Sequence, residues 1–486
     1  MKKIVLFISV LVFIVGCSGD FIDLSPLSSN TVDKVYKTEK DFQDAVVGCY
    51  AAIRGRLSSH SSFEIASDDV HHSRTSSGNN VDLNEYLYNS SNSNFQSAWQ
   101  GYYSCIYRVN FLLREIEDKS ESVVINKQRH IAEVKYIRAL AYFDLVRMFG
   151  AVPLVTKVVT DPDEARTMGR RPIDEIYTQI YSDLIDAGNV LPVSYSGVDV
   201  GRATKGAAKA ILGRAYLTHK KYTEAETILR EVTTMGYALL PDYRDLFDYS
   251  KDEHHSEYIW DLEYEAGTTP TMGNGLTNDC LPSWARLADF HGIIGGGRND
   301  SYGPSDELFT IFEDHDPRKE ITCARGFTDH DGVYYAIIDE VSGAQVAKSW
   351  TNKYMAPVPA TGGGSAANWK VIRYADVLLM LAEAMNENGK TLEAHDVLNQ
   401  VIERSLPGEG VSGLSQSDLR KAIWEERRRE LSFEGHRLWD LFRTGQFLEK
   451  CGPLGAQPHM TLFPIPISEW QKMNNPEIFP QNPGWD

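Results

Sequence analysis

Positive charge is scarce in this chain of 486 residues. Lys and Arg number 49 against 67 Asp and Glu, which gives a formal net charge of -18 at pH 7. Nucleic acids and anionic membrane surfaces attract a positive protein face, so this charge argues against both as partners. The hydrophobic content of 42% is nevertheless ample for a large core.

Cysteine motifs and catalytic motifs are also missing. The 6 cysteines show no CxxC spacing, which argues against a disulfide framework and a cysteine zinc site. We expect those after Cys17 to be small buried apolar residues. There is no HExxH or GxSxG motif, and Gly295-Gly296-Gly297 is not followed by the Lys-Ser/Thr of a phosphate-binding loop. We interpret the glycine runs as flexible loop.

Long apolar runs are absent except near the start, where residues 1–16 are typical of an export signal. Two lysines precede an apolar run over residues 4–15, and Gly16 stands directly before Cys17, as in a bacterial lipobox. The pattern predicts lipidation of Cys17 and a tether over residues 17–35. A plain secretory signal with a fortuitous cysteine is the alternative. No other run is long enough to span a bilayer, so we expect an anchored protein.

Helical periodicity dominates residues 36–240 and 369–486. Within them, two helix hairpins repeat the same alternation of large and small residues at the same spacing. The matched positions are Leu212, Gly213, Tyr216, Ala225, Leu229 and Val232 in one copy, and Leu381, Ala382, Met385, Ala394, Leu398 and Val401 in the other. This match predicts tetratricopeptide-type helix pairs in a mainly α-helical fold. The alternative is two ordinary amphipathic hairpins that match by chance.

Two stretches lack helical periodicity. Residues 58–94 are rich in Ser, His, Asn and Asp and are predicted to be loop. Residues 241–368 hold glycine runs, scattered aromatics and brief alternating segments such as 333–338, which predict a long loop-rich insertion with short strands. Insertions of this kind tend to carry function, so we expect the ligand-binding face here.

Long motifs in a fixed order resemble the SusD/RagB family of outer-membrane lipoproteins. Besides the lipobox, the matching segments are IRALAYFDLVRMFGAVPLV at 137–155, GRATKGAAKAILGRAYL at 201–217, RYADVLLMLAEAMNENG at 373–389 and ERRRELSFEGHRLWDLFRTG at 426–445. The resemblance implies a cell-surface lipoprotein that covers a SusC-like TonB-dependent transporter. It also implies capture of nutrients, usually oligosaccharides, without cleavage and without a cofactor.

Other functions stay open beside this one. The same architecture could capture peptides or another non-sugar nutrient, or form a lid that binds no ligand well. A glycoside hydrolase would need two carboxylates facing each other across a cleft. In the charged run 425–430, we favour an ion-pair network that locks helices over a catalytic carboxylate pair, because such dense opposite charges neutralise one another.

Candidate ligand contacts lie in both loop regions. Trp284 and Trp350 of the insertion are candidate platforms, because a flat aromatic ring can cover the apolar face of a sugar. In the polar loop we select Asp69, His72, Arg74 and Tyr86, since carboxylates and guanidinium groups suit sugar hydroxyls. No metal is assigned, because the adjacent histidines 71 and 72 cannot easily face one ion. Whether a structural Ca²⁺ occupies an Asp-rich loop is left open.

Overall fold

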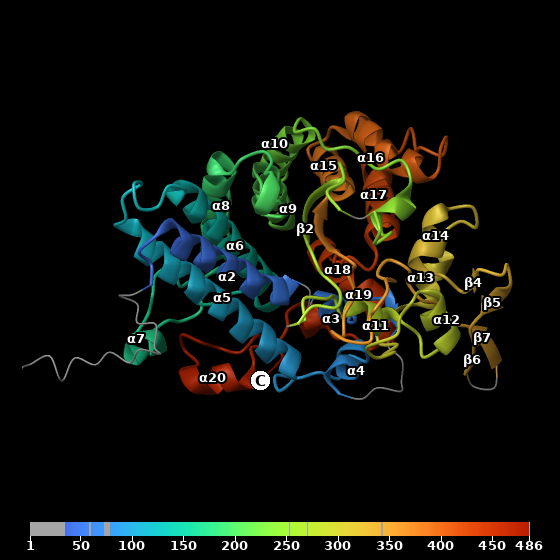
Figure 1. Cartoon of the computed structure of the whole chain (residues 1–486), viewed down its shortest axis with the longest axis horizontal. Helices are drawn as coiled ribbons and strands as arrows, with labels where there is room; N and C mark the ends of the chain where they lie inside the picture. The colour runs from blue at the N-terminus through green and yellow to red at the C-terminus, as the bar shows by residue number, and fades with distance from the viewer. Residues whose placement is uncertain are drawn as a thin grey trace, which may run out of the picture.

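Paired helices follow one another along the chain and form one stack. The structure, a computed structural model, describes residues 35–57, 60–71, 78–251, 253–269, 271–341 and 344–485. Figure 1 shows the stack running from α2 and α5 on the left to α15 and α16 near the top. The packed pairs are α2 (Glu39–Leu57) with α5 (Ser93–Glu117), α6 (Lys127–Phe149) with α8 (Ile173–Val190), α9 (Lys205–Thr218) with α10 (Tyr222–Thr233), and α15 (Tyr374–Glu387) with α16 (Thr391–Ser405). The mainly α-helical prediction is confirmed.

The two predicted repeat copies are the pairs α9–α10 and α15–α16. Their inner positions are buried as expected, among them Leu229 and the matching Leu398. A Cβ atom added to Gly213 would lie 2.4 Å from Leu229 Cδ2, so glycine permits the close approach of α9 to α10. Helix α10 also packs on α15, which makes the two copies neighbours in space although the insertion separates them in sequence.

Local signals set the helix ends. Gly150 follows α6 with a φ of 71°, a backbone conformation that glycine adopts without strain. The side chain of Asn92 accepts a hydrogen bond from the backbone N–H of Asn94 and caps α5. Pro172 stands directly before α8, where its missing N–H costs nothing. Each boundary is thus set by a residue type that such a position favours.

Residues 58–94 are more ordered than we predicted. Their described part contains α3 (His60–Glu64), strand β1 (Val70–His71) and α4 (Asn79–Asn84). Phe63 and Leu83 anchor the two short helices in the core. Helices of five and six residues are too short to show the period that identifies a longer helix, which is why the prediction of loop was wrong here.

Short strands occur in the insertion, as predicted, but two strands paired with them, β1 and β8 (Trp369–Arg373), lie in stretches predicted to be loop and helix. Strand β2 (Tyr258–Leu262) pairs with β8, so the insertion leaves and rejoins the stack at adjacent strands. The other antiparallel pairs are β1 with β3 (Gly303–Pro304), β4 (Gly326–Thr328) with β5 (Tyr334–Ala336), and β6 (Ile338–Val341) with β7 (Ala344–Ala347). The short helices here are α11 (Leu276–Cys280), α12 (Ala285–Phe290), α13 (Asp306–Thr310) and α14 (Pro317–Thr322).

Two glycines of the predicted flexible runs occupy crowded positions instead. A Cβ atom on Gly364 would lie 2.6 Å from the backbone of Gly273, and one on Gly295 would lie 2.0 Å from the carbonyl oxygen of Pro359. Neighbouring residues Asn274 and Ser365 form a backbone bridge. Both glycines therefore serve close backbone packing.

The C-terminal helices complete the core. They are α17 (Gln416–Leu431), α18 (Arg437–Thr444), α19 (Phe447–Cys451) and α20 (Ile467–Met473); the remaining short elements are α7 (Pro162–Arg166), η3 (Gly197–Asp199), η4 (Tyr243–Leu246), η5 (Gly452–Leu454) and η6 (Pro458–Thr461). All five cysteines of the described residues are buried and unbridged, as predicted. In that part of the chain, none of the helices combines the length and apolar character that a membrane span needs.

Candidate functional site

A cluster of aromatic side chains forms part of the surface of the insertion. Trp284 precedes α12 and is half-buried. Its ring meets Phe327 of β4 at a centroid distance of 5.5 Å and Tyr335 of β5 at 6.4 Å, both edge-on. Phe327 and Tyr335 lie 5.7 Å apart. These contacts support the indole while leaving part of it accessible to a ligand.

Polar groups surround the same cluster and hold its hairpin in shape. The guanidinium of Arg286 lies 4.2 Å from the centroid of the Tyr335 ring. In the turn between β4 and β5, Asp329 accepts hydrogen bonds from the backbone N–H groups of Asp331 and Val333 at 3.0 and 2.9 Å. The bond from Val333 is the chief cause that lowers the pKa of the Asp329 carboxyl. The turn is therefore fixed by a charged acceptor.

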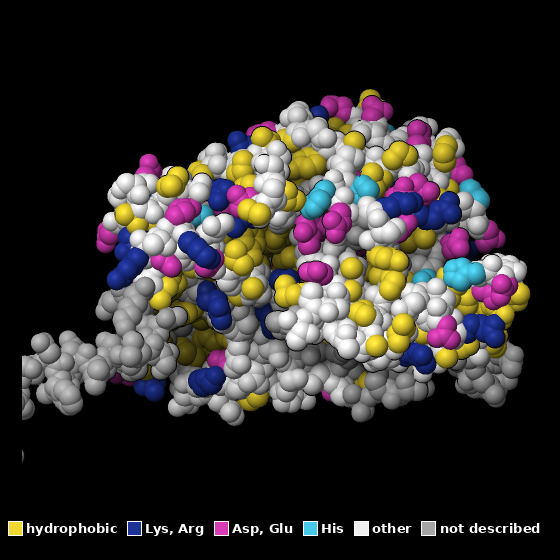
Figure 2. Space-filling model, in the orientation of Figure 1, with side chains coloured by type: hydrophobic (Ala, Val, Ile, Leu, Met, Phe, Trp, Pro, Cys, Tyr) yellow, Lys and Arg dark blue, Asp and Glu magenta, His cyan; other side chains and the backbone are white. Residues whose placement is uncertain are grey.

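The aromatic surface extends beyond Trp284. Phe290 lies 4.7 Å from Phe327 and stacks on His330 at 5.0 Å between ring centroids. Tyr334 and Ile294 are 66% and 79% exposed. The insertion occupies the right of Figure 1, and the same area of Figure 2 shows hydrophobic side chains among Lys, Arg and His. Flat apolar rings beside hydrogen-bonding groups can cover and orient a polar, ring-shaped ligand.

Trp350, the second predicted platform, lies in the core and is removed from the candidate site. Its side chain is 0% exposed, and its Nε1 donates to Asn352 Oδ1 at 2.9 Å. The backbone forms a bridge with Ala324, which fixes the ring inside the insertion. A ligand at the surface does not reach this ring.

Asp69 and Tyr86 are also buried, so the expectation that they face a ligand is wrong. Asp69 accepts a hydrogen bond of 2.6 Å from Nε of Arg428, a residue of α17. The hydroxyl of Tyr86 donates to the carbonyl of Ala66 at 2.9 Å. Both side chains join the start of the polar loop to the core. The predicted contacts His72 and Arg74, and the predicted lipidation site Cys17, lie outside the described residues.

The charged run 425–430 forms the buried ion-pair network that we favoured. Glu430 receives ion pairs from Arg318 at 3.1 Å and Arg373 at 2.6 Å, and a third from Arg404. Glu426 pairs with Arg318 at 2.5 Å. Each of these carboxylates is already neutralised by arginine, which leaves neither in the role of a free acid or base.

A third carboxylate in this network, Glu434, joins the insertion to the stack. It binds Lys353 of the insertion at 2.8 Å and Arg373 of β8 at 2.7 Å. Arg373 and then Lys353 lower the pKa of Glu434 to about 2 against the opposing effect of burial. The network therefore holds the insertion, and with it the aromatic cluster, in a fixed position on the helices.

Phe290, Phe327 and Tyr335 complete the cluster and were not selected from the sequence. Only Tyr335 carried a signal, because it falls in the alternating run 333–338. The pairing of β4 with β5 brings Phe327 opposite Tyr335, a relationship that spacing alone does not show. For metals, no group of three or more His, Cys, Asp or Glu in the described parts of the chain is placed to hold an ion.

Comparisons with known proteins give the family. A SusD family model matches residues 250–459, and a second model, described as starch-binding and associating with the outer membrane, matches residues 20–217. SusD-like protein P2 of Formosa agariphila is 28% identical over 538 residues, covering 100% of both chains. Starch-binding protein SusD of Bacteroides thetaiotaomicron is 24% identical over 442 residues, covering 78% of this chain and 76% of its own.

Solved structures agree with the family models. A laminarin binding SusD-like protein is 29% identical with a TM-score of 0.78, covering 92% of this chain and 100% of its own. Fold and site together define a mainly α-helical repeat protein with an aromatic-faced insertion. With two family models that between them match most of its length, this chain belongs to the SusD/RagB family.

Proposed function

We propose that this protein is a cell-surface outer-membrane lipoprotein that binds oligosaccharides without cleaving them. It delivers them to a TonB-dependent, SusC-like transporter for uptake. The observation that carries the proposal is the partly exposed ring of Trp284, supported edge-on by Phe327 and Tyr335 and flanked by Arg286. A sugar ring can stack on the indole while its hydroxyls bond to the flanking polar groups.

Relatives support both the ligand class and the location. One structural neighbour is named as a laminarin binding protein, and one curated relative as a starch-binding protein. The family model over residues 20–217 is described as associating with the outer membrane. In our proposal the attachment is a lipid on Cys17, and the aromatic surface of the insertion faces the incoming glycan.

The binding role without catalysis is supported by the charge arrangement. Glu426 and Glu430, which belong to the most densely charged stretch of the chain, are each bound by buried arginines. A glycosidase needs one carboxyl free to donate a proton and a second free to attack or to activate water. Arginine-neutralised carboxylates in the core meet neither need.

The test is a binding screen of residues 18–486 against a polysaccharide panel, by affinity gels and calorimetry, with released sugar measured in parallel. Binding to a glycan without release is the expected result. Release of sugar would overturn the non-catalytic role. Binding of peptides in place of glycans would establish the alternative ligand class on the same architecture. Co-purification with a SusC-like transporter from outer membranes tests the delivery step.

A further inference from the structure

Two cavities lie side by side, the first on the helical stack and the second between the stack and β2 at the start of the insertion, and neither is lined by residues of the Trp284 cluster. One has a volume of about 380 Å³ and the other about 430 Å³, and both are lined by Ser194 and Tyr195. These residues belong to the connection between α8 and α9. Cavities that bind small molecules have volumes of roughly 300–1,000 Å³. Each cavity is therefore large enough for a short saccharide.

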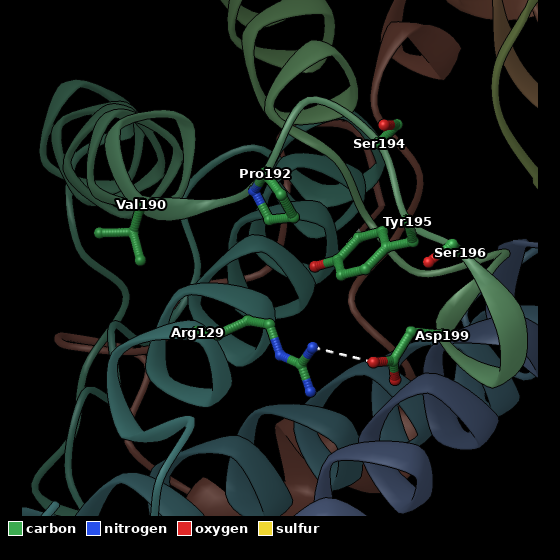
Figure 3. A pocket seen from close by; sticks show the side chains of 7 residues that line it. All are labelled: Arg129, Val190, Pro192, Ser194, Tyr195, Ser196 and Asp199. Atoms are coloured by element: carbon green, nitrogen blue, oxygen red, sulfur yellow. Dashed lines mark hydrogen bonds and ion pairs between the residues drawn. The ribbon is translucent and has the colours of Figure 1, made fainter.

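Tyr195 separates the two cavities and is aimed into the first. Figure 3 shows its hydroxyl directed into the space framed by Val190, Pro192 and Arg129. The hydroxyl oxygen is buried, yet no group among the described residues is hydrogen-bonded to it. A buried hydroxyl without a partner is costly, by about 1–3 kcal/mol, so a ligand group that hydrogen-bonds to this oxygen would stabilise the complex.

Charged groups line the floor of the first cavity and are held in place. Arg129 pairs with Asp199 at 2.9 Å, and its guanidinium lies 5.8 Å from the centroid of the Tyr195 ring. Arg202 binds Asp199 at 2.8 Å and the buried Glu133 at 2.8 Å. These partners orient donors and acceptors before any ligand arrives, which lowers the cost of binding.

The second cavity combines the same kinds of group. Its lining includes the half-buried ring of Tyr237, together with His255, Asp261 and Glu263. The Nε2 atom of His255 is buried and has no hydrogen-bond partner in the described parts of the chain. Tyrosine rings, imidazole and carboxylates present flat apolar faces next to acceptors and donors, the combination that suits a sugar.

The loop that carries Tyr195 is fastened at its base. The backbone N–H of Lys205 donates to the carbonyl of Pro192 at 2.8 Å, and that of Ala203 donates to the hydroxyl of Tyr50 at 3.0 Å. These bonds tie the two ends of the connection to one another and to α2. The walls of the two cavities are therefore fixed in position.

We propose that the paired cavities around Tyr195 form a second saccharide-binding site, separate from the Trp284 surface. The ligand is a neutral saccharide, because Arg129 and Arg202 are already paired with Asp199 and Glu133, while Asp261 and Glu263 in the second cavity would repel phosphate, sulfate or uronate groups. The choice of a sugar rests on the proposed function. A second site would let one long glycan bind at two points and raise its overall affinity.

Saturation-transfer NMR on the mature protein tests this inference with laminarihexaose, maltohexaose and the glycan identified by the panel as probes. The Trp284→Ala variant should keep a clear saturation-transfer signal. Adding Tyr195→Ala should reduce that signal at least fivefold. Adding Tyr249→Ala, an exposed tyrosine that lines neither cavity, should leave it unchanged.

Two further variants guard against misfolding. Added to Trp284→Ala, Tyr195→Phe keeps the ring and removes the buried hydroxyl, and we expect at least a twofold loss of the saturation-transfer signal. Ser196→Trp fills the first cavity from an exposed position without removing any packing, and we expect a loss like that of Tyr195→Ala. Melting temperatures report whether each variant is folded.

The outcomes separate the two hypotheses. If Trp284→Ala alone abolishes the signal of a saccharide that the wild-type protein binds, there is no second site and the proposed function stands. If the double variant with Tyr195→Ala still binds as Trp284→Ala does, and Ser196→Trp is also without effect, the second site lies elsewhere and this inference is wrong. If the wild-type protein binds no saccharide, the proposed function fails as well.

Discussion

Arg373 and Glu434 form a two-point ion pair in the core, with an Nε–Oε2 distance of 2.7 Å and an Nη2–Oε1 distance of 2.9 Å. Both side chains are 1% exposed. The pair joins β8, where the chain returns from the insertion, to the segment between α17 and α18. It therefore links the insertion to the scaffold.

Arg373→Met should lower the free energy of unfolding by about 3–5 kcal/mol, because it leaves Glu434 and Glu430 without their shared buried cation. Urea denaturation followed by circular dichroism measures the change. The control is Arg171→Met, which removes the exposed pair with Glu175 and should cost less than about 1 kcal/mol. Equal losses in the two variants would show that burial of the pair does not matter.

The buried carboxyl of Glu64 should make the stability of the folded protein depend on pH. Burial raises its pKa to about 7, while Tyr302 donates to it. The folded protein then binds a proton that the unfolded chain releases near pH 4.5, so stability falls as the pH rises from about 4.5 to 7. A shift of this size corresponds to about 3 kcal/mol.

Glu64→Gln should remove this fall, because the amide stays neutral and can still accept from Tyr302 and the backbone N–H of Gly435. Unfolding free energies of both proteins at pH 5, 6, 7 and 8 make the comparison. Parallel curves for the two proteins would mean that Glu64 is ionised throughout this range.

Trp284→Ala should weaken oligosaccharide binding at the insertion at least tenfold, the order of about 1.4 kcal/mol, while leaving helix content unchanged. Calorimetry with the glycan found in the panel measures the affinity. Trp470→Ala is the matched control, since Trp470 is a half-buried tryptophan on α20. Unaltered affinity of Trp284→Ala would place the platform elsewhere on the protein.

Gly213→Ala tests the contact between the helices of the first repeat copy. The added methyl group would lie 2.4 Å from Leu229 Cδ2, and overpacking of this kind costs about 1–3 kcal/mol, more than the gain in helix propensity. We expect a net loss of about 1–2 kcal/mol, measured by thermal unfolding. The second change Leu229→Val should recover part of it. A more stable Gly213→Ala protein would show that α9 and α10 separate without cost.

The sequence predicted the parts of this fold that depend on local spacing. The helix pairs and the burial of the matched repeat positions follow from a period of 3.6 residues. Gly213 and Ala382 are matched by spacing, and for Gly213 the structure gives the reason for a small residue, because it faces Leu229 of the next helix.

Contacts between distant segments could not be predicted in this way. Asp69 looks like a surface residue in a polar loop, but its partner Arg428 lies 359 residues further along the chain. Trp284 and Trp350 both lie in the insertion, and the burial of Trp350 depends on its backbone bridge to Ala324, a distant residue that spacing does not reveal. Sequence spacing carries no information on such pairings.

The pairing of β2 with β8 has a consequence for how this protein can diversify. Because Leu262 lies opposite Trp369, the residues between them start and finish at one place on the helices. The entropy of closing such a loop rises only slowly with its length, by roughly 0.6 kcal/mol for each doubling. The segment can therefore be exchanged for one of different length and ligand preference, provided that the new segment keeps the cations that Arg318 and Lys353 supply to Glu426, Glu430 and Glu434 of the scaffold.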